Sequence, residues 1–172
     1  MPFAKVEGKT LHYTDHPRHD QSTPSASQAA PLTIIFVHGL GSTQNFYQPI
    51  LGYFTNFARC ITFDNYAAGR SKYLSELYPD TSIPAIAQDV LGLMDYLKID
   101  KAVLVGYSMG GMVPTTVAGM KPDRVIGAVL VGPVHPTPEV AAIFTKRIQT
   151  VREGLSPCFD ATFLVPGSAC FV

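Results

Sequence analysis

The sequence predicts an α/β fold in which a mostly parallel sheet is flanked by helices. Short apolar runs, such as residues 33–37 and 125–131, are typical of buried strands. Longer segments between them show helical periodicity, and the apolar residues of 83–97 fall on one helical face. Strands that alternate with helices in this way imply parallel strands with helices on both faces of the sheet.

The elements expected in chain order are two strands joined by a tight turn over 3–12, an exposed polar loop over 16–30, a strand over 33–37, a helix over 45–57, a strand over 59–63, a loop over 65–80, a helix to about 97, a strand over 102–106, a helix to about 120, a strand over 125–131 and a helix over 136–152. Glycine at position 8 predicts the first turn. Thr81 or Ser82 is a candidate helix cap. Pro114 predicts a local bend or an early irregularity of the helix, because proline lacks an amide hydrogen and crowds the preceding turn.

Composition excludes several classes of function. Lys and Arg total 13 and Asp and Glu total 13, so the net charge is zero and no nucleic-acid partner is expected. No apolar run approaches the roughly 18 residues of a membrane span. The N-terminal residues lack the apolar stretch of a signal peptide, and the 3 cysteines are scattered. We therefore expect a cytoplasmic protein with reduced thiols and no membrane association.

The motif G-x-S-x-G occupies residues 106–110, after an apolar strand and before a helical segment. This context is typical of a nucleophile elbow, a sharp turn that exposes a serine hydroxyl at a helix N-terminus. Ser108 is the candidate nucleophile. The alternative is a glycine-rich turn in which this serine has no chemical role.

Two further motifs agree with the elbow. His38-Gly39-Leu40-Gly41 follows the strand over 33–37, and the strand over 59–63 leads into D-N-Y-A-A-G-R-S at 64–71. In order and spacing, these motifs resemble the α/β-hydrolase family over residues 5–152, and most closely its 3-oxoadipate enol-lactonase and esterase branch. That family usually carries D-x-x-G-x-G-x-S at the third motif, whereas this chain has alanine at 67 and 68.

The resemblance implies a serine hydrolase that cleaves a carboxylic ester or lactone through an acyl-serine intermediate. The N–H groups of Leu40 and Met109 would then form the oxyanion hole beside Ser108. The expected partner is a small-molecule ester or lactone, with no cofactor and no metal. An aspartate nucleophile is disfavoured, because position 108 is serine.

A serine nucleophile also needs a base and an acid, which the family places after Ser108 in the order acid, then histidine. His135 alone follows Ser108, at the point where a lid would begin, so both groups are apparently missing. His38 is expected to be structural. The remaining histidines are expected to be solvated: His12, His16 and His19.

Residues 1–154 are expected to be the N-terminal part of a hydrolase domain, with a lid starting near 136–154. Residues 155–172 form an atypical tail: either a seventh strand after a skipped lid, or an unrelated end that mimics one. At 172 residues the chain looks C-terminally truncated against a fold of eight strands and a lid. The alternatives to an enzyme are a non-catalytic truncated isoform and a ligand-binding receptor of the same fold. The apolar run 125–131 could mediate self-association as an exposed edge.

Overall fold

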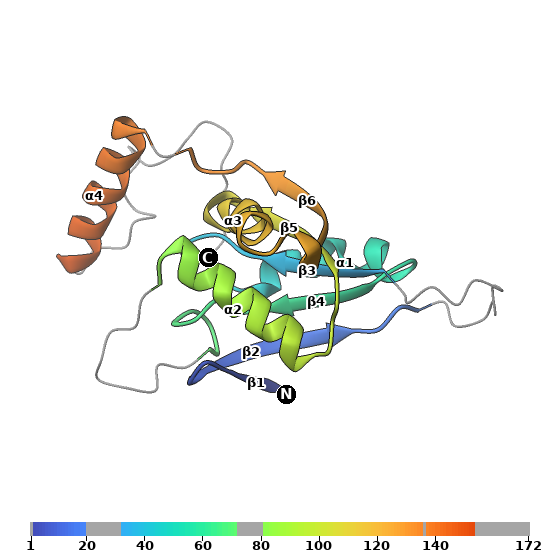
Figure 1. Cartoon of the computed structure of the whole chain (residues 1–172). Helices are drawn as coiled ribbons and strands as arrows, with labels where there is room; N and C mark the ends of the chain where they lie inside the picture. Colours follow the sequence, from blue (N-terminus) through green and yellow to red (C-terminus); the bar gives the residue numbers. More distant parts are fainter. Residues whose placement is uncertain (1, 20–31, 72–80, 136, 154–172) are drawn as a thin grey trace. The chain divides into compact units, whose positions relative to one another are not determined.

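The computed structural model describes residues 2–19, 32–71, 81–135 and 137–153. The chain divides into two compact units, Met1–Pro133 and Val134–Val172. The first unit contains the sheet with its helices, and the second contains helix α4, Pro138–Arg152 (Figure 1). The expected tail, 155–172, lies outside the described residues, so the domain division at 154 stays a prediction.

The first unit has six strands, three α-helices and three short 3-10 helices among its described residues. Their bounds are β1 Phe3–Val6, β2 Lys9–His16, β3 Thr33–Val37, η1 Gln44–Tyr47, α1 Gln48–Thr55, β4 Arg59–Phe63, α2 Ile83–Tyr96, β5 Ala102–Tyr107, η2 Ser108–Met112, α3 Val113–Met120, η3 Pro122–Arg124 and β6 Val125–Val131.

The sheet is mixed and mostly parallel, as predicted. Its strand order is β1-β2-β4-β3-β5-β6. The first hairpin pairs antiparallel, and β2 continues antiparallel onto β4. The pairs β3–β4, β3–β5 and β5–β6 are parallel. Because parallel strands share a direction, the loops after β3, β4 and β5 emerge at one edge of the sheet, where open α/β sheets place their sites.

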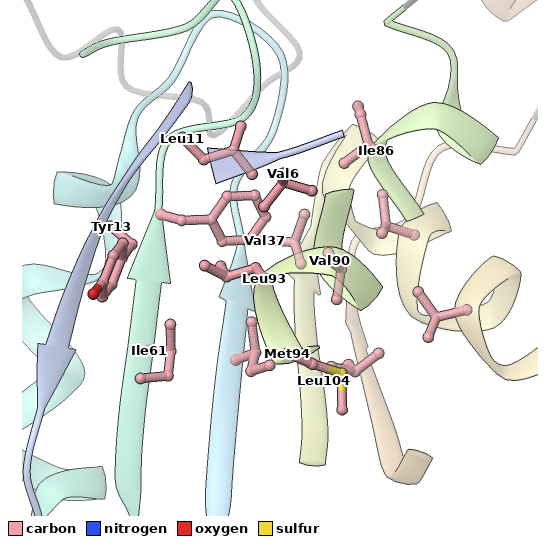
Figure 2. Packing of buried hydrophobic residues seen from close by; sticks show 14 of the residues in the cluster. Val6, Leu11, Tyr13, Val37, Ile61, Ile86, Val90, Leu93, Met94 and Leu104 are labelled. Carbon is pink, nitrogen blue, oxygen red and sulfur yellow. The ribbon is translucent and has the colours of Figure 1, made fainter. Parts of the chain in front are cut away.

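Alternating residues of β3, β4 and β5 supply two cores, one on each face. On β3, Ile35 and Val37 face the cluster beneath α2 and α3, whereas Ile34 and Phe36 face the cluster beneath α1. Figure 2 shows side chains of α2 packed against the larger cluster. All five residues of β3 are buried, which explains its continuous apolar run. The strand that leads into the candidate site is therefore packed on both faces.

Two local departures from the sequence prediction have clear causes. The second strand runs on to His16, because Asp15 and His16 pair with β4 although they are polar. The elbow helix begins as the 3-10 helix η2 and becomes α-helical only at Val113, with Pro114 in its first turn. The irregularity predicted at Pro114 is confirmed: the proline occupies a position where its missing N–H leaves no hydrogen bond unmade.

Among the described residues, no helix combines the length and apolar character needed to cross a bilayer.

Strand β6 is the outer strand of the described sheet, and its large apolar residues are exposed: Ile126, Val129, Leu130 and Val131. Unpaired apolar edges favour pairing with another chain. We expect concentration-dependent self-association, with Val129→Lys shifting the protein toward the monomer in size-exclusion chromatography with light scattering. Tyr53→Lys, on α1 and 74% exposed, is the control and should leave association unchanged. A wild type that stays monomeric at all concentrations would contradict this prediction.

Candidate active site at the strand–helix elbow

Ser108 lies at the sharp turn between β5 and η2. Its φ is +54°, in the left-handed region that non-glycine residues rarely adopt. Such a conformation costs about 1–3 kcal/mol and persists only where the surrounding structure imposes it. The strained serine at the end of a central parallel strand is the local geometry that the motif predicts for a nucleophile elbow.

The glycines of the motif are required by close backbone contacts. A Cβ at Gly106 would overlap the Gly110 carbonyl group, and a Cβ at Gly110 would overlap the carbonyl oxygens of Val37 and His38. The first turn of the elbow therefore packs directly on the end of β3. This contact joins the two motifs that carry the resemblance, although almost seventy residues separate them in the sequence.

The His38–Gly41 loop lies beside the serine. A Cβ at Gly39 would be 3.2 Å from the Cβ of Ser108 and 3.2 Å from the Tyr107 carbonyl oxygen. Leu40 follows directly and exposes 60% of its surface, whereas Met109 is half-buried against the larger core cluster. Met109 therefore adjoins Ser108 in the sequence, and Leu40 follows the glycine that lies against Ser108. Their N–H directions toward the Ser108 hydroxyl stay a prediction.

His38 is buried and occupied at both ring nitrogens. Nδ1 lies 2.8 Å from the Gly39 carbonyl oxygen, and Nε2 accepts the Asn65 N–H at 2.9 Å. Burial lowers the pKa of His38, and this effect outweighs the Gly39 hydrogen bond and the nearby Asp64, which raise it. Because the lone pair of Nε2 already accepts the Asn65 N–H, this imidazole has no free acceptor for the Ser108 proton, which agrees with the structural role expected for it.

Asp64 directly follows β4 and organises the loop there. Its carboxylate accepts the N–H of Gln44 at 2.8 Å and the N–H of Arg70 at 2.9 Å. His12 Nδ1 lies 3.2 Å from the same group. Burial raises the pKa of Asp64, but these hydrogen bonds outweigh it, and the pKa lies below its ordinary value. Asp64 therefore ties the loop after β4 to the start of η1, just beyond the His38–Gly41 loop.

The expectation that His12 is solvated was wrong. His12 is buried against Asp64, because alternation along β2 directs it toward the loop after β4. His16 is half-buried beside the Thr62 hydroxyl, at 3.1 Å, and His19 is exposed. Within the described part of Met1–Pro133, no histidine hydrogen-bonds the Ser108 hydroxyl. His135 belongs to the second unit.

Ala67 adopts a φ of +63°, at the position where the family pattern has glycine. Alanine in this region is strained by about 1–2 kcal/mol, and its side chain here is exposed. Glycine relieves this strain, but it also loses more conformational entropy on folding than alanine does. We therefore expect Ala67→Gly to raise the free energy of unfolding by a net value of about 0.5–1 kcal/mol in urea titrations. Ala68→Gly is the control, since Ala68 has no positive φ and should lose stability. Equal losses in both variants would contradict the strain at Ala67.

Sequence reasoning missed Asn65. Its Nδ2 donates to the His38 carbonyl oxygen at 3.1 Å, in addition to the backbone contact with the His38 ring. A signal was present: Asn65 is the second of two polar residues that follow a buried strand, next to the strand that carries the H-G-L-G motif. The stacking of Phe46 on Tyr107, with ring centroids 4.6 Å apart, was also missed, because the two residues are far apart in the sequence.

Comparison with known proteins agrees with this geometry. A family model described as the alpha/beta hydrolase fold matches residues 33–155. The putative carbamate hydrolase RutD of Caulobacter vibrioides is 29% identical over 154 residues, covering 89% of this chain and 53% of RutD. The strigolactone esterase RMS3 of Pisum sativum is 27% identical over 106 residues, covering 58% of this chain and 38% of that protein.

The enol-lactonase of Burkholderia xenovorans is a similar solved structure. Its TM-score is 0.72 at 27% identity, and the match covers 88% of this chain and 54% of that one. The chain thus spans about half the length of the relatives it matches. The elbow, the H-G-L-G loop, the strand order and the family match over 33–155 lead to one conclusion: the chain belongs to the α/β-hydrolase fold family.

Proposed function

We propose that this chain carries the nucleophile and the oxyanion hole of a serine hydrolase that acts on small carboxylic esters or lactones. The observation that carries the proposal is the left-handed Ser108 held against Gly39 at the carboxyl end of the sheet. The names of similar proteins, an enol-lactonase and a strigolactone esterase, support this substrate class.

In the proposed reaction, Ser108 Oγ attacks the carbonyl carbon while a base accepts the hydroxyl proton. The carbonyl oxygen becomes an oxyanion, which the N–H groups of Leu40 and Met109 stabilise. Collapse of this intermediate expels the alcohol, which takes up a proton, and leaves an acyl-serine. In a lactone the expelled alcohol stays attached to the acyl group. Water then hydrolyses the acyl-serine and regenerates the serine.

The oxyanion donors are backbone groups, so the side chains at 40 and 109 should matter little to the chemistry. The base is the component that the described part of Met1–Pro133 does not place at the serine. Without it, a serine hydrolase keeps roughly 10³–10⁴-fold acceleration over water, against a total of about 10⁶ lost on removing the triad. We therefore expect slow steady-state turnover by the 172-residue chain.

Burst kinetics with p-nitrophenyl acetate test the proposal. An acyl-serine that forms faster than it hydrolyses releases about one equivalent of p-nitrophenolate per chain before slow turnover. We expect Ser108→Ala to abolish the burst. Thr115→Ala removes an exposed hydroxyl from α3 and should retain it. A burst that survives Ser108→Ala would contradict the proposed nucleophile.

The lack of a histidine hydrogen bond to Ser108 among the described residues of Met1–Pro133 favours one alternative: a non-catalytic protein that binds a small molecule through the same fold. The two functions predict different results. A binding protein would bind an ester or lactone reversibly, with no burst and no turnover. Turnover equal to that of a complete esterase, abolished by Ser108→Ala, would instead show that this chain supplies its own base.

A further inference from the structure

Asn65 connects two loops that follow neighbouring parallel strands. It is the second residue of the loop after β4, and it hydrogen-bonds His38 at the start of the loop after β3. Its backbone N–H donates to His38 Nε2 at 2.9 Å, and its side-chain Nδ2 donates to the His38 carbonyl oxygen at 3.1 Å. Both residues are at least 96% buried. The His38 ring and the His38 peptide are thus held by one residue from another loop.

The first of these contacts determines the tautomer of His38. A ring nitrogen that accepts an N–H has no proton of its own, so a neutral His38 carries its proton on Nδ1. Nδ1–H then donates to the Gly39 carbonyl oxygen, 2.8 Å away. The Asn65 amide and the Gly39 carbonyl group therefore lie at opposite ends of a single imidazole.

The Gly39 carbonyl group in turn determines the direction of the Leu40 N–H. Both groups belong to one planar trans peptide, in which they point in opposite directions. While His38 Nδ1–H holds the Gly39 oxygen, the Leu40 N–H must point away from His38. Glycine at position 39 lacks a side chain that would hinder rotation of this peptide, so the hydrogen bond contributes directly to its orientation.

The side chain of Asn65 is also unusual for a purely structural residue. Its amide orientation is assigned by the His38 carbonyl oxygen, because a flipped amide would place two acceptors together. In this orientation Oδ1 is buried and has no hydrogen-bond partner among the described residues. An unpaired buried acceptor costs about 1–3 kcal/mol. The unpaired Oδ1 therefore lowers the stability of the fold. An asparagine kept here despite that cost is consistent with a role for its Nδ2 in the site.

We propose that Asn65 is a positioning residue that fixes the direction of the Leu40 N–H through His38. The inference rests on the proposed function for the use of that N–H by Ser108. Two contacts make up this arrangement: the backbone N–H of residue 65, which every substitution except proline keeps, selects the tautomer of His38, and Asn65 Nδ2 anchors the His38 peptide. The side-chain variants below test the second contact. Asn65 itself does not contact the reacting atoms.

The rate constant for phosphonylation of Ser108 by a fluorophosphonate tests the proposal. An oxyanion donor displaced by about 1 Å can cost about 100-fold in rate. We expect Asn65→Ala to slow labelling by roughly 10- to 100-fold, and Asn65→Asp, which replaces the Nδ2 donor by an acceptor, to slow it at least as much. Rates are compared at equal folded fraction, measured by circular dichroism.

Ser71→Ala is the matched control. Ser71 lies on the same loop and is buried, and its hydroxyl bonds the backbone of Asp64 and His12 without touching His38. Ser71→Ala should therefore lose stability but keep the wild-type labelling rate per folded molecule. Equal labelling rates in Asn65→Ala and Ser71→Ala would overturn the positioning role.

Nitrogen-15 NMR supplies a readout that does not depend on reactivity. In the wild type we expect the His38 ring to carry its proton on Nδ1, and the Nε2–H tautomer would overturn the proposal. We expect Asn65→Asp to shift the Leu40 amide resonance and to speed its hydrogen exchange, with Ser71→Ala leaving both unchanged. If wild-type Ser108 does not label at all, the proposed function fails, and these amide measurements still decide the role of Asn65. Unchanged Leu40 exchange in both Asn65 variants would refute it.

Discussion

Gly110→Ala is expected to lower the free energy of unfolding by about 3–5 kcal/mol, among the largest effects that one methyl group can have. The new Cβ would overlap the carbonyl oxygens of Val37 and His38, which belong to a buried central strand and its end. Backbone atoms cannot move aside as flexible side chains can. The elbow would have to separate from β3, and Ser108 would move away from the Gly39 loop.

Urea unfolding followed by circular dichroism measures this effect, with Gly119→Ala as the control. Gly119 lies in α3, where a Cβ meets nothing within 4 Å and φ is not positive. The same substitution should therefore stabilise the protein there by about 0.5–1 kcal/mol, through helix propensity and reduced unfolded-state entropy. Opposite signs are predicted for the two variants. A Gly110→Ala protein as stable as the wild type would show that the elbow does not pack on β3 in this way.

Asp64→Asn is expected to cost about 3 kcal/mol, because it disrupts several buried hydrogen bonds to one charged group. The isosteric amide keeps one acceptor but places a donor against the N–H groups of Gln44 or Arg70. Urea titration is the measurement. Asp15→Asn is the control, since Asp15 forms a partly exposed ion pair with Arg59 that should contribute less than about 1 kcal/mol. Equal effects in the two variants would contradict the role of Asp64.

The shifted pKa of Asp64 predicts that the free energy of unfolding depends on pH. The folded-state pKa of Asp64 lies below the ordinary value of 3.8, so the unfolded chain takes up the proton first as the pH falls. The stabilisation from Asp64 is complete above pH 3.8 and is lost below it, through the lower folded-state pKa. The stability difference between wild type and Asp64→Asn should therefore shrink as the pH falls below this value. A difference that stays constant down to acid unfolding would contradict it.

The strands and the elbow were predictable because local chemistry determines them. The apolar run of β3 is buried on both faces, and the glycines at 106 and 110 meet carbonyl groups that a Cβ would overlap. The extension of β2 to His16 was not predictable, because its polar residues are held by pairing with β4. Pairing of this kind depends on strand order, which hydrophobic periodicity does not contain.

The hydrogen bonds that connect the loops around the site could not be predicted from the sequence. His12 looked like a solvated residue of a terminal strand, yet it lies against Asp64, which is distant along the chain. Asn65 stood within a recognised motif without a visible role, because its partner is the histidine of another motif. The motifs thus located the loops of the site in the sequence. The hydrogen bonds between those loops could be identified only from the three-dimensional structure.

The most direct test of the central claim is mass-spectrometric mapping of the 172-residue chain after reaction with a fluorophosphonate. Serines outside such a site do not react, whereas in the proposed site Ser108 has the elbow and the oxyanion donors but no base placed beside it within the described part of Met1–Pro133, so we expect a slow reaction whose adduct reports those two components together. We predict one adduct per chain, located on Ser108 and absent from Ser108→Ala. An adduct on another residue, or no adduct on folded protein, would contradict the assignment of Ser108 as the nucleophile.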